Sequence, residues 1–196
     1  MLIDKVVLAT RNPGKLREFR RLLQPFGCGL VGLQEIAISW DHAETGASFA
    51  ENARMKAIAY SAGTDMEVLA DDSGLEVAAL GGRPGICSAR YAGPGAADGE
   101  RVQKLLEELR DVPPPRHAHF ACALALAQRG RLLLEAEGEC PGEIGFEPRG
   151  NSGFGYDPIF IVPALARTFA ELGEDEKNRI SHRARAVKAL FRLARR

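Results

Sequence analysis

The fold class is decided near the start of the chain, by the stretch KVVLATRNPGKLREFRRLL at residues 5–23. Residues 5–9 are an apolar, β-branched run that is typical of a buried strand. Residues 10–14 follow with Asn, Pro and Gly, which favour a turn. From residue 15 to residue 23 the apolar side chains recur at helical spacing, which predicts an amphipathic helix. A strand, a tight turn and a helix in succession indicate an α/β protein.

The rest of the chain continues this alternation. Ser48, with Glu51 three residues later, matches a capping box and predicts a helix over residues 48–62. Arg129-Gly130 predicts a hairpin turn, and Asp98 is expected to cap a further helix. The remaining strands are predicted at residues 29–33, 68–70, 75–79, 118–127, 132–139 and 159–162, the remaining helices at 98–109 and from 181 to the end, and polar irregular segments at 41–47, 81–85 and 141–157. Without a repeat or a linker, residues 1–196 are expected to form one domain, in which the hairpin is a candidate for a second lobe.

The bulk composition excludes several classes of protein. The 26 basic residues among the 196 are balanced by 26 acidic ones. Proteins that bind nucleic acid usually carry a basic excess, so this balance argues against a nucleic-acid partner. No window approaches the ~20 apolar residues of a membrane span, and no stretch fits a signal peptide. The four cysteines form neither a zinc nor a disulfide pattern. Together these features predict a soluble, cytoplasmic protein without a membrane partner.

The first of three polar clusters that could carry chemistry is Thr10-Arg11-Asn12-Pro13-Gly14-Lys15. A glycine-containing turn that leads into a helix presents backbone N–H groups and the positive end of the helix dipole, which suits phosphate. Lys15 adds a full positive charge. A Walker A loop is disfavoured, because its first glycine would be Ala9 and its Ser or Thr would be Leu16. An ordinary strand-to-helix turn remains the alternative.

The second cluster is Asp71-Asp72-Ser73-Gly74, which directly follows an apolar strand. Two adjacent carboxylates at a strand end repel each other unless a cation lies between them. Mg²⁺ fits this chemistry, because one or two carboxylates and the phosphate oxygens of a substrate commonly hold it. Glu44 could supply a further carboxylate. The alternatives are a polar turn for the aspartates and a solvated loop acid for Glu44.

The third cluster is spread over the C-terminal half, as Gly153-Phe154-Gly155-Tyr156-Asp157-Pro158, Glu176-Lys177-Asn178 and Ser181-His182-Arg183. An aromatic ring between two glycines can offer its face to a base. The start of a helix at Ser181 would bring N–H groups, an imidazole and a guanidinium together. The alternatives are a surface histidine near a helix end and a turn aromatic that folds back on the core.

Taken in order, these motifs resemble the Ham1-like family of noncanonical purine nucleoside-triphosphate pyrophosphatases, also known as inosine/xanthosine triphosphate pyrophosphatases. The motifs that carry the resemblance are Thr10-x-Asn12-x-x-Lys15, Ser48-Phe49-x-Glu51-Asn52-Ala53, Ala70-Asp71-Asp72-Ser73-Gly74-Leu75, Pro84-Gly85-Ile86-x-Ser88-Ala89-Arg90-Tyr91, Gly153-Phe154-Gly155-Tyr156-Asp157-Pro158 and Lys177-x-x-Ile180-Ser181-His182-Arg183. They cover nearly the whole chain. One departure is Ala184, where the family commonly has glycine.

The resemblance implies an elongated mixed sheet flanked by helices, two lobes with the active cleft between them, and a homodimer. It implies Mg²⁺-dependent hydrolysis of ITP, dITP and XTP between the α- and β-phosphates, releasing the monophosphate and pyrophosphate. The implied roles are the triphosphate for Thr10, Arg11, Asn12, Pro13, Gly14 and the catalytic Lys15, the metal for Glu44 and Asp72, a proton acceptor for Asp72, a substrate contact for Ser73, base and sugar for Phe154, Gly155, Tyr156 and Asp157, and phosphate and base edge for Lys177, His182 and Arg183.

Three rival functions remain to be weighed. A Maf-like pyrophosphatase would act on other nucleoside triphosphates, and Ser181-His182-Arg183 with residues 153–157 argues against it. A non-catalytic nucleotide sensor or nucleic-acid binder is disfavoured by the zero net charge and the paired aspartates. A P-loop phosphotransferase is disfavoured by Ala9 and Leu16.

Overall fold

The computed structural model describes residues 2–36, 38 and 42–195, so Asp41, the first residue of one expected loop, and Arg196, the last of the C-terminal helix segment, lie outside it. The chain divides into two compact units. Unit 1 comprises Met1–Asp72, Cys122–Gly138 and His182–Arg196, and unit 2 comprises Ser73–Ala121 and Glu139–Ser181. The boundaries after Asp72, Ala121 and Gly138 each fall within a strand, so three strands contribute residues to both units.

Within the described residues, seven strands form one mixed sheet in the order β2-β1-β3-β4-β5-β6-β7. β1 runs parallel to β2 and β3, whereas β6 runs antiparallel to β5 and β7. The α/β class is therefore confirmed. The strands are β1 (Lys5–Leu8), β2 (Gly29–Gly32), β3 (Glu67–Val77), β4 (His117–Gln128), β5 (Arg131–Ile144), β6 (Phe160–Val162) and β7 (Arg167–Thr168).

Most of the helices follow the predicted periodicity, but the short helix Glu174–Ile180 was not predicted. The helices are α1 (Pro13–Leu23), α2 (Phe49–Ser61), α3 (Asp98–Glu108), α4 (Glu174–Ile180) and α5 (His182–Ala194). Ser48 caps α2, because its hydroxyl accepts the N–H of Glu51. Asp98 is the first residue of α3 rather than its cap, which is Ala97. Across the described part of the chain, no helix combines the length and apolar character that crossing a bilayer requires.

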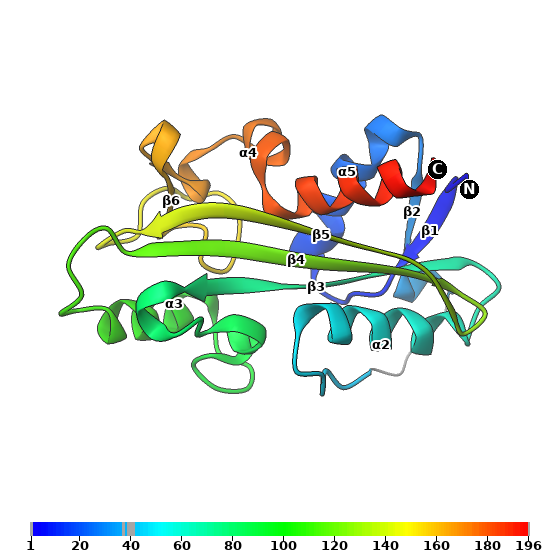
Figure 1. The fold of residues 1–196 in the computed structure, drawn as a ribbon, viewed down its shortest axis with the longest axis horizontal. Coiled ribbons are helices and arrows are strands. Elements are labelled where there is room, and N and C mark those ends of the chain that lie inside the picture. Colours follow the sequence, from blue (N-terminus) through cyan, green and yellow to red (C-terminus); the bar gives the residue numbers. More distant parts are fainter. Residues whose placement is uncertain (1, 37, 39–41, 196) are drawn as a thin grey trace. The chain divides into compact units, whose positions relative to one another are not determined.

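Unit 1 packs helices on both faces of its part of the sheet (Figure 1). Because side chains alternate along a strand, Val6 and Leu8 of β1 belong to a core cluster with α1 and α5, whereas Val7 packs in a second cluster with α2. β4 alternates in the same way, with leucines at 124 and 126 on the first face and alanines at 123, 125 and 127 on the second. The small alanines allow α2 to lie close to the sheet.

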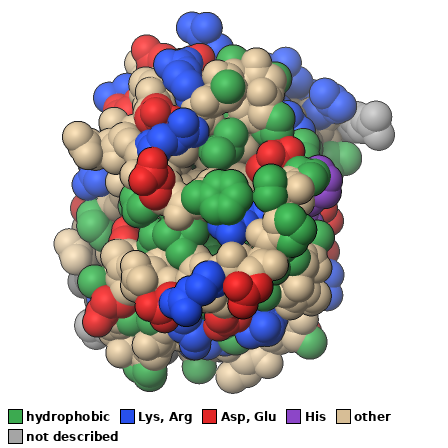
Figure 2. Space-filling view, turned by 90° about the vertical axis from the view of Figure 1, so that its left-hand side faces the viewer, with side chains coloured by type: hydrophobic (Ala, Val, Ile, Leu, Met, Phe, Trp, Pro, Cys, Tyr) green, Lys and Arg blue, Asp and Glu red, His purple; other side chains and the backbone are tan. Residues whose placement is uncertain are grey.

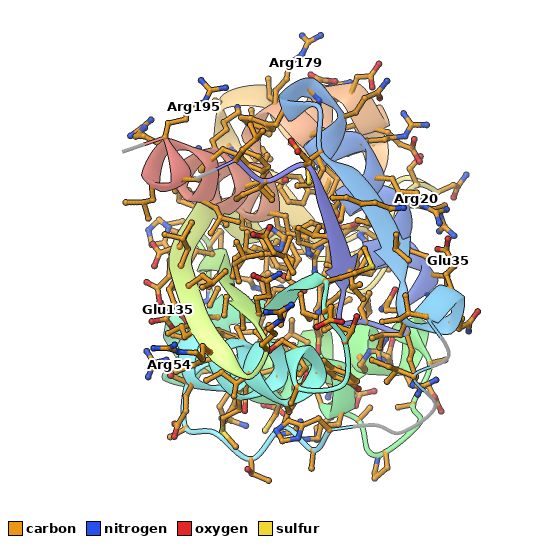
Figure 3. All side chains as sticks on the ribbon, turned by 90° about the vertical axis from the view of Figure 1, so that its right-hand side faces the viewer. Arg20, Glu35, Arg54, Glu135, Arg179 and Arg195 are labelled. Carbon is orange, nitrogen blue, oxygen red and sulfur yellow. The ribbon has the colours of Figure 1, made fainter. Side chains whose placement is uncertain are left out.

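Oppositely charged side chains form ion pairs on the surface of unit 1. Arg54 of α2 and Glu135 of β5 point toward each other in Figure 3, with Arg54 Nε 2.8 Å from Glu135 Oε1. Arg20 and Glu35, also labelled there, form a second pair, with Arg20 Nη2 3.5 Å from Glu35 Oε1. Both pairs are exposed to solvent, so each contributes at most ~1 kcal/mol to stability.

Unit 2 has a separate core built on aromatic rings. The ring centroid of Phe160 lies 4.6 Å from that of Phe120 and 4.9 Å from that of Phe169. Such tilted pairs add modestly to the area that the rings bury. Unit 2 leaves Phe146 63% exposed, with the Arg116 guanidinium 4.0 Å from its ring centroid. Figure 2 shows one end face of the molecule, where hydrophobic side chains gather beside basic ones.

Two predicted segments are wrong. Residues 68–70 and 75–79 were expected to be separate strands around an aspartate turn, but β3 runs unbroken from Glu67 to Val77 and contains both aspartates. The cause is tertiary, because partners from α1, α2 and α5 satisfy the carboxylates inside the sheet. Residues 141–144 were expected to be irregular but belong to β5. Gly142 is needed there, since a Cβ would lie 2.5 Å from the Ile161 carbonyl oxygen.

Candidate functional site

The turn before α1 is stabilised by its own side chains. Asn12 is the N-cap of α1, and its Oδ1 accepts the N–H groups of Gly14 at 2.8 Å and Lys15 at 3.1 Å. Thr10 Oγ1 accepts the N–H of Asn12 at 3.1 Å. The expectation that this turn offers unoccupied N–H groups is therefore wrong for Gly14 and Lys15. Arg11 and Pro13 are exposed. The clearest group here for binding an anion is the Lys15 ammonium.

Asp71 is the buried carboxylate that holds this ammonium. Its Oδ2 lies 2.6 Å from Lys15 Nζ, and its Oδ1 lies 3.6 Å from Arg183 Nε and 3.1 Å from Cys122 Sγ, a weak donor. Burial alone would raise the pKa of Asp71, but the positive charges of Lys15 and Arg183 outweigh it and hold this pKa well below its ordinary value. Asp71 is therefore an ionised centre that α1 and α5 share.

Arg183 makes a second ion pair in the same region. Its Nη1 donates to Glu18 Oε2 at 2.9 Å, and both side chains are at least nine-tenths buried. Glu18 lies one helical turn after Lys15, so α1 supplies both a cation and an anion here. His182 is only 1% exposed, which contradicts the alternative of a surface histidine.

Two further polar residues of the site, Asn52 and Lys56, come from α2, and the sequence motifs assigned neither of them a role. Lys56 Nζ lies 2.5 Å from Glu44 Oε1 and 2.8 Å from the Asp71 carbonyl oxygen. Burial lowers the pKa of Lys56, but the negative charges of Glu44 and the two aspartates raise it by more, so the net shift of this pKa is upward. Asn52 accepts the N–H of Gly46 at 2.7 Å and donates to Asp72 Oδ2 at 2.9 Å. Asn52 thus connects the loop of Glu44 to Asp72.

A sequence pattern could have revealed these two residues. Asn52, Lys56 and Tyr60 follow one another at intervals of four, so they share one face of a helix. That face is buried. A buried lysine and asparagine among apolar neighbours need polar partners, and these are the carboxylates of the second cluster.

Asp72 differs from Asp71 in its surroundings. Burial raises the pKa of Asp72 to about 6, and the negative charge of Glu44 adds to this shift. The like charge that acts on Asp72 is therefore that of Glu44, and not that of Asp71 as the sequence predicted. A buried carboxylate and a partly exposed one that repel each other are a favourable donor set for a hard divalent cation. Among the residues the structure describes, no group of three or more His, Cys, Asp and Glu could hold a metal alone. The residues therefore fit Mg²⁺ only with oxygens from a substrate.

Unit 2 contains the rest of the expected site residues. Lys177 Nζ lies 2.6 Å from Asp157 Oδ2 and 5.2 Å from the ring centroid of Phe154. Lys177 and Asp157 are buried, whereas Phe154 and Ser73 are partly exposed. The third cluster is thereby divided, because Lys177 belongs to unit 2 and His182 to unit 1.

Within residues 154–157, one side chain is suited to meet a ligand. The Tyr156 side chain is buried, and its hydroxyl donates to the Ser88 carbonyl oxygen at 3.0 Å. Asp157 accepts the N–H of Phe154 at 2.9 Å in addition to holding Lys177. Gly155 has no side chain. The Phe154 ring is therefore the group of this segment that can present a face, with the positive charge of Lys177 beside it.

The chain is similar to known proteins over almost its whole length. A model of the Ham1 family matches residues 6–193. The dITP/XTP pyrophosphatase of Gloeobacter violaceus is 54% identical over 186 residues, which cover 95% of this chain and 92% of that protein. The dITP/XTP pyrophosphatase of Bacillus subtilis is 47% identical over 194 residues, or 98% of each. The solved structure of a HAM1 protein from Coxiella burnetii has a TM-score of 0.87 at 44% identity, covering 100% of this chain and 99% of that one.

Proposed function

Because this chain belongs to the Ham1 family, we propose that it hydrolyses purine nucleoside triphosphates with the wrong base, namely ITP, dITP and XTP. The products are the nucleoside monophosphate and pyrophosphate. The names of its relatives, which are dITP/XTP pyrophosphatases at 47% and 54% identity, favour this activity over that of a Maf-like enzyme.

The observation that carries the proposal is the contrast between two neighbouring aspartates. Asp71 is compensated by Lys15 and Arg183, whereas Asp72 faces the like charge of Glu44. A strand with a purely structural role would not need two adjacent carboxylates with opposite pKa shifts. Oppositely tuned acids are typical of catalytic sites, where one group organises cations and the other takes part in chemistry.

Glu44 and Asp72 are the residues that would hold Mg²⁺, together with phosphate oxygens of the substrate. When bound, the ion supplies positive charge that offsets the triphosphate and stabilises the leaving pyrophosphate. Lys56 keeps Glu44 in place through its short ion pair. Asn52 fixes the other carboxylate through its hydrogen bond to Asp72.

The residues of the chain then divide the work of hydrolysis. Lys15 neutralises phosphate charge, and Asp71 holds the lysine at a defined place for this task. Thr10, Arg11, Asn12, Pro13 and Gly14 form the turn that positions Lys15. Asp72 accepts a proton from the attacking water, a step for which a carboxylate with a raised pKa is better suited than an ordinary one. The bond between the α- and β-phosphates breaks.

We assign the selection of the base to hydrogen-bond donors at the start of α5 and, separately, a stacking role to the aromatic ring of Phe154. Inosine and xanthine carry an oxygen at C6, which accepts a hydrogen bond, where adenine carries an amino donor. The Arg183 guanidinium, which Glu18 and Asp71 orient, and the backbone near His182 are donors, so the amino group of adenine would set donor against donor. Sites built this way discriminate by ~10⁴-fold or more. Phe154 stacks on the base and Ser73 contacts the nucleoside. Gly155, Tyr156 and Asp157 bind the nucleoside through the loop that they hold around Phe154, and Lys177 contributes its charge.

The decisive experiment is a substrate panel. Pyrophosphate release is measured from ITP, XTP, dITP, GTP, ATP and dTTP, with and without Mg²⁺. We expect release from the first three and little from the others, and loss of activity when EDTA removes the metal. Release from ATP or dTTP in preference to ITP would point to a Maf-like enzyme. Absence of release from every nucleotide would leave a nucleotide sensor.

The same family membership leads us to propose a homodimer that acts in the cytoplasm, with no nucleic-acid or membrane partner. Sedimentation equilibrium tests the dimer directly. A single species at 21.2 kDa, the mass of one chain, would contradict it.

A further inference from the structure

The carboxylate of Asp98, a residue of α3, contacts the loop that carries Phe154. Asp98 Oδ2 accepts the backbone N–H of Gly155 at 2.6 Å, across 57 positions of sequence. This aspartate was expected to cap α3, but the N-cap is Ala97 and its N–H is bonded by Glu100 at 2.6 Å. The helix start therefore does not require the Asp98 side chain, which is directed to another part of unit 2.

The loop needs external support because of its two glycines. Gly153 has φ +79° and Gly155 has φ +63°, values that glycine adopts easily and other residues rarely do. The N–H of Phe154 is bonded to Asp157 Oδ2, and the next N–H, that of Gly155, is bonded to Asp98. Carboxylates thus hold the backbone on both sides of Phe154. Removing the Asp98 carboxylate frees the peptide between Phe154 and Gly155 to rotate.

Asp98 is itself held in place. It forms an ion pair with Arg101, one turn further along α3. The Arg101 guanidinium also donates to the carbonyl oxygens of Ala89 at 2.6 Å and Ala96 at 3.1 Å. Ala89 belongs to the short helical segment Gly85–Arg90, which also receives the hydroxyl of Tyr156. Two routes, one through the N–H of Gly155 and one through the hydroxyl of Tyr156, therefore anchor the loop to the same segment.

We propose that Asp98 is a positioning residue for nucleobase binding: by holding the N–H of Gly155, it fixes the Phe154 ring in the orientation that stacks on the base. This inference rests on the proposed function, in which Phe154 is the stacking group. It assigns Asp98 to the nucleoside end of the substrate and gives it no part in phosphate binding or in the chemical step. The expected consequence is a change in KM with little change in kcat.

The test compares Asp98→Ala and Asp98→Asn with Glu100→Ala. Glu100 is the matched control, because it is a first-turn acid of the same helix that bonds the N–H of Ala97 and not the loop. Inorganic tripolyphosphate, which has no base, serves as a competitive inhibitor that reports on the phosphate end alone. All variants are assayed with ITP, and thermal unfolding checks that each is folded.

We expect Asp98→Ala to raise the KM for ITP about tenfold, equivalent to about 1.4 kcal/mol, with kcat within about twofold of wild type. Asp98→Asn keeps one oxygen acceptor, so its KM for ITP should lie between those of wild type and Asp98→Ala. Glu100→Ala should leave KM unchanged, and the inhibition constant of tripolyphosphate should be the same in all four proteins.

Three results would overturn the proposal. These are an unchanged KM in Asp98→Ala, an equal rise of KM in Glu100→Ala, and a parallel rise in the inhibition constant of tripolyphosphate. Should Asp98→Ala not fold, an unchanged KM in Asp98→Asn and in Arg101→Gln together would overturn it as well. Failure of the proposed function has a different appearance, because wild type itself would then release no pyrophosphate from ITP.

Discussion

Asp71 and Asp72 are adjacent in sequence, yet their side chains meet different helices. Asp71 bonds Lys15 of α1 and lies near Arg183 of α5, whereas Asp72 bonds Asn52 of α2. The reason is the continuity of β3, since successive side chains of a strand point to opposite faces of the sheet. One face therefore receives a carboxylate surrounded by cations, and the other receives a carboxylate beside Glu44. A single polar dipeptide provides two environments with opposite effects on pKa.

Replacing Asp71 by asparagine should destabilise unit 1. The variant leaves the charges of Lys15 and Arg183 without their buried counterion, and breaking a buried pair in this way costs about 3–5 kcal/mol. The pKa of Asp71 is lowered in the folded state, so its contribution is present above the unfolded pKa of ~3.9 and is lost as pH falls below it. Urea unfolding of wild type and variant from pH 3 to pH 7 should show a gap that widens with pH.

The control for this experiment is Glu135→Gln, which removes an exposed ion pair with Arg54. It should change the free energy of unfolding by no more than ~1 kcal/mol at any pH. Equal stabilities of wild type and Asp71→Asn at pH 7 would show that Asp71 is not the counterion described here.

Asp72→Asn should lower turnover far more than it weakens substrate binding. The amide can still accept from Asn52 and fills the same space, but it cannot take a proton from water. Loss of a general base typically costs 10²–10⁴-fold in rate. The measurement is kcat from pyrophosphate release, set against the Kd for ITP from calorimetry at fixed Mg²⁺. Comparable losses in kcat and in binding, with the fold intact, would contradict the role of Asp72 as base.

Glu44→Gln should weaken the binding of Mg²⁺ more than the binding of the nucleotide. Removing one of two carboxylates reduces the negative charge of the donor set, so the half-saturating Mg²⁺ concentration should rise by about 10–100-fold. Glu51→Gln is a matched control, because Glu51 is an acid that bonds the same loop at the N–H of Ala47. An equal Mg²⁺ requirement in wild type and Glu44→Gln would remove Glu44 from the metal site.

The local elements of the fold were predictable because each depends on a pattern of residues that are close together in the sequence. β1 followed by α1, the cap at Ser48 and the hairpin at Arg129-Gly130 all depend on residues close together in sequence. The hairpin turn illustrates this, since both of its residues have positive φ, +49° and +74°, as the tightest hairpins require. Such features need no knowledge of the rest of the chain.

The positions of the acidic residues were not predictable in the same way. A polar run after an apolar strand usually ends the strand, and only the distant partners Lys15, Asn52 and Arg183 make it possible for β3 to continue. The division of the third cluster has a similar cause. Ser181 has extended backbone between α4 and α5, with φ −63° and ψ 158°, so the helix expected to begin there starts one residue later and Lys177 belongs to a different unit from His182.

Arg183→Ala should narrow the preference for ITP over ATP. Without the guanidinium, the site loses a donor that favours an oxygen at C6, and the amino group of ATP no longer meets a donor at that place. The ratio of kcat/KM for ITP to that for ATP should fall by ~10-fold or more. Arg183 also pairs with Glu18, so Glu18→Gln is measured in parallel to separate loss of packing from loss of base recognition. An unchanged ratio in Arg183→Ala would exclude Arg183 from base recognition.

Gly138→Ala should destabilise the protein through the contact between β5 and α5. A Cβ at Gly138 would lie 2.3 Å from the backbone N of Ala186 and 2.4 Å from the His182 carbonyl oxygen, so the helix would have to move away from the strand. Overpacking of this kind typically costs about 1–3 kcal/mol, which corresponds to a fall in Tm of several degrees for a chain of this size. Gly99→Ala is the control, because a Cβ in α3 meets nothing within 4 Å and alanine favours the helix. Since α5 begins with His182 and Arg183, a displaced helix should also lower activity, and a Gly138→Ala variant with wild-type Tm and wild-type activity would contradict this close packing.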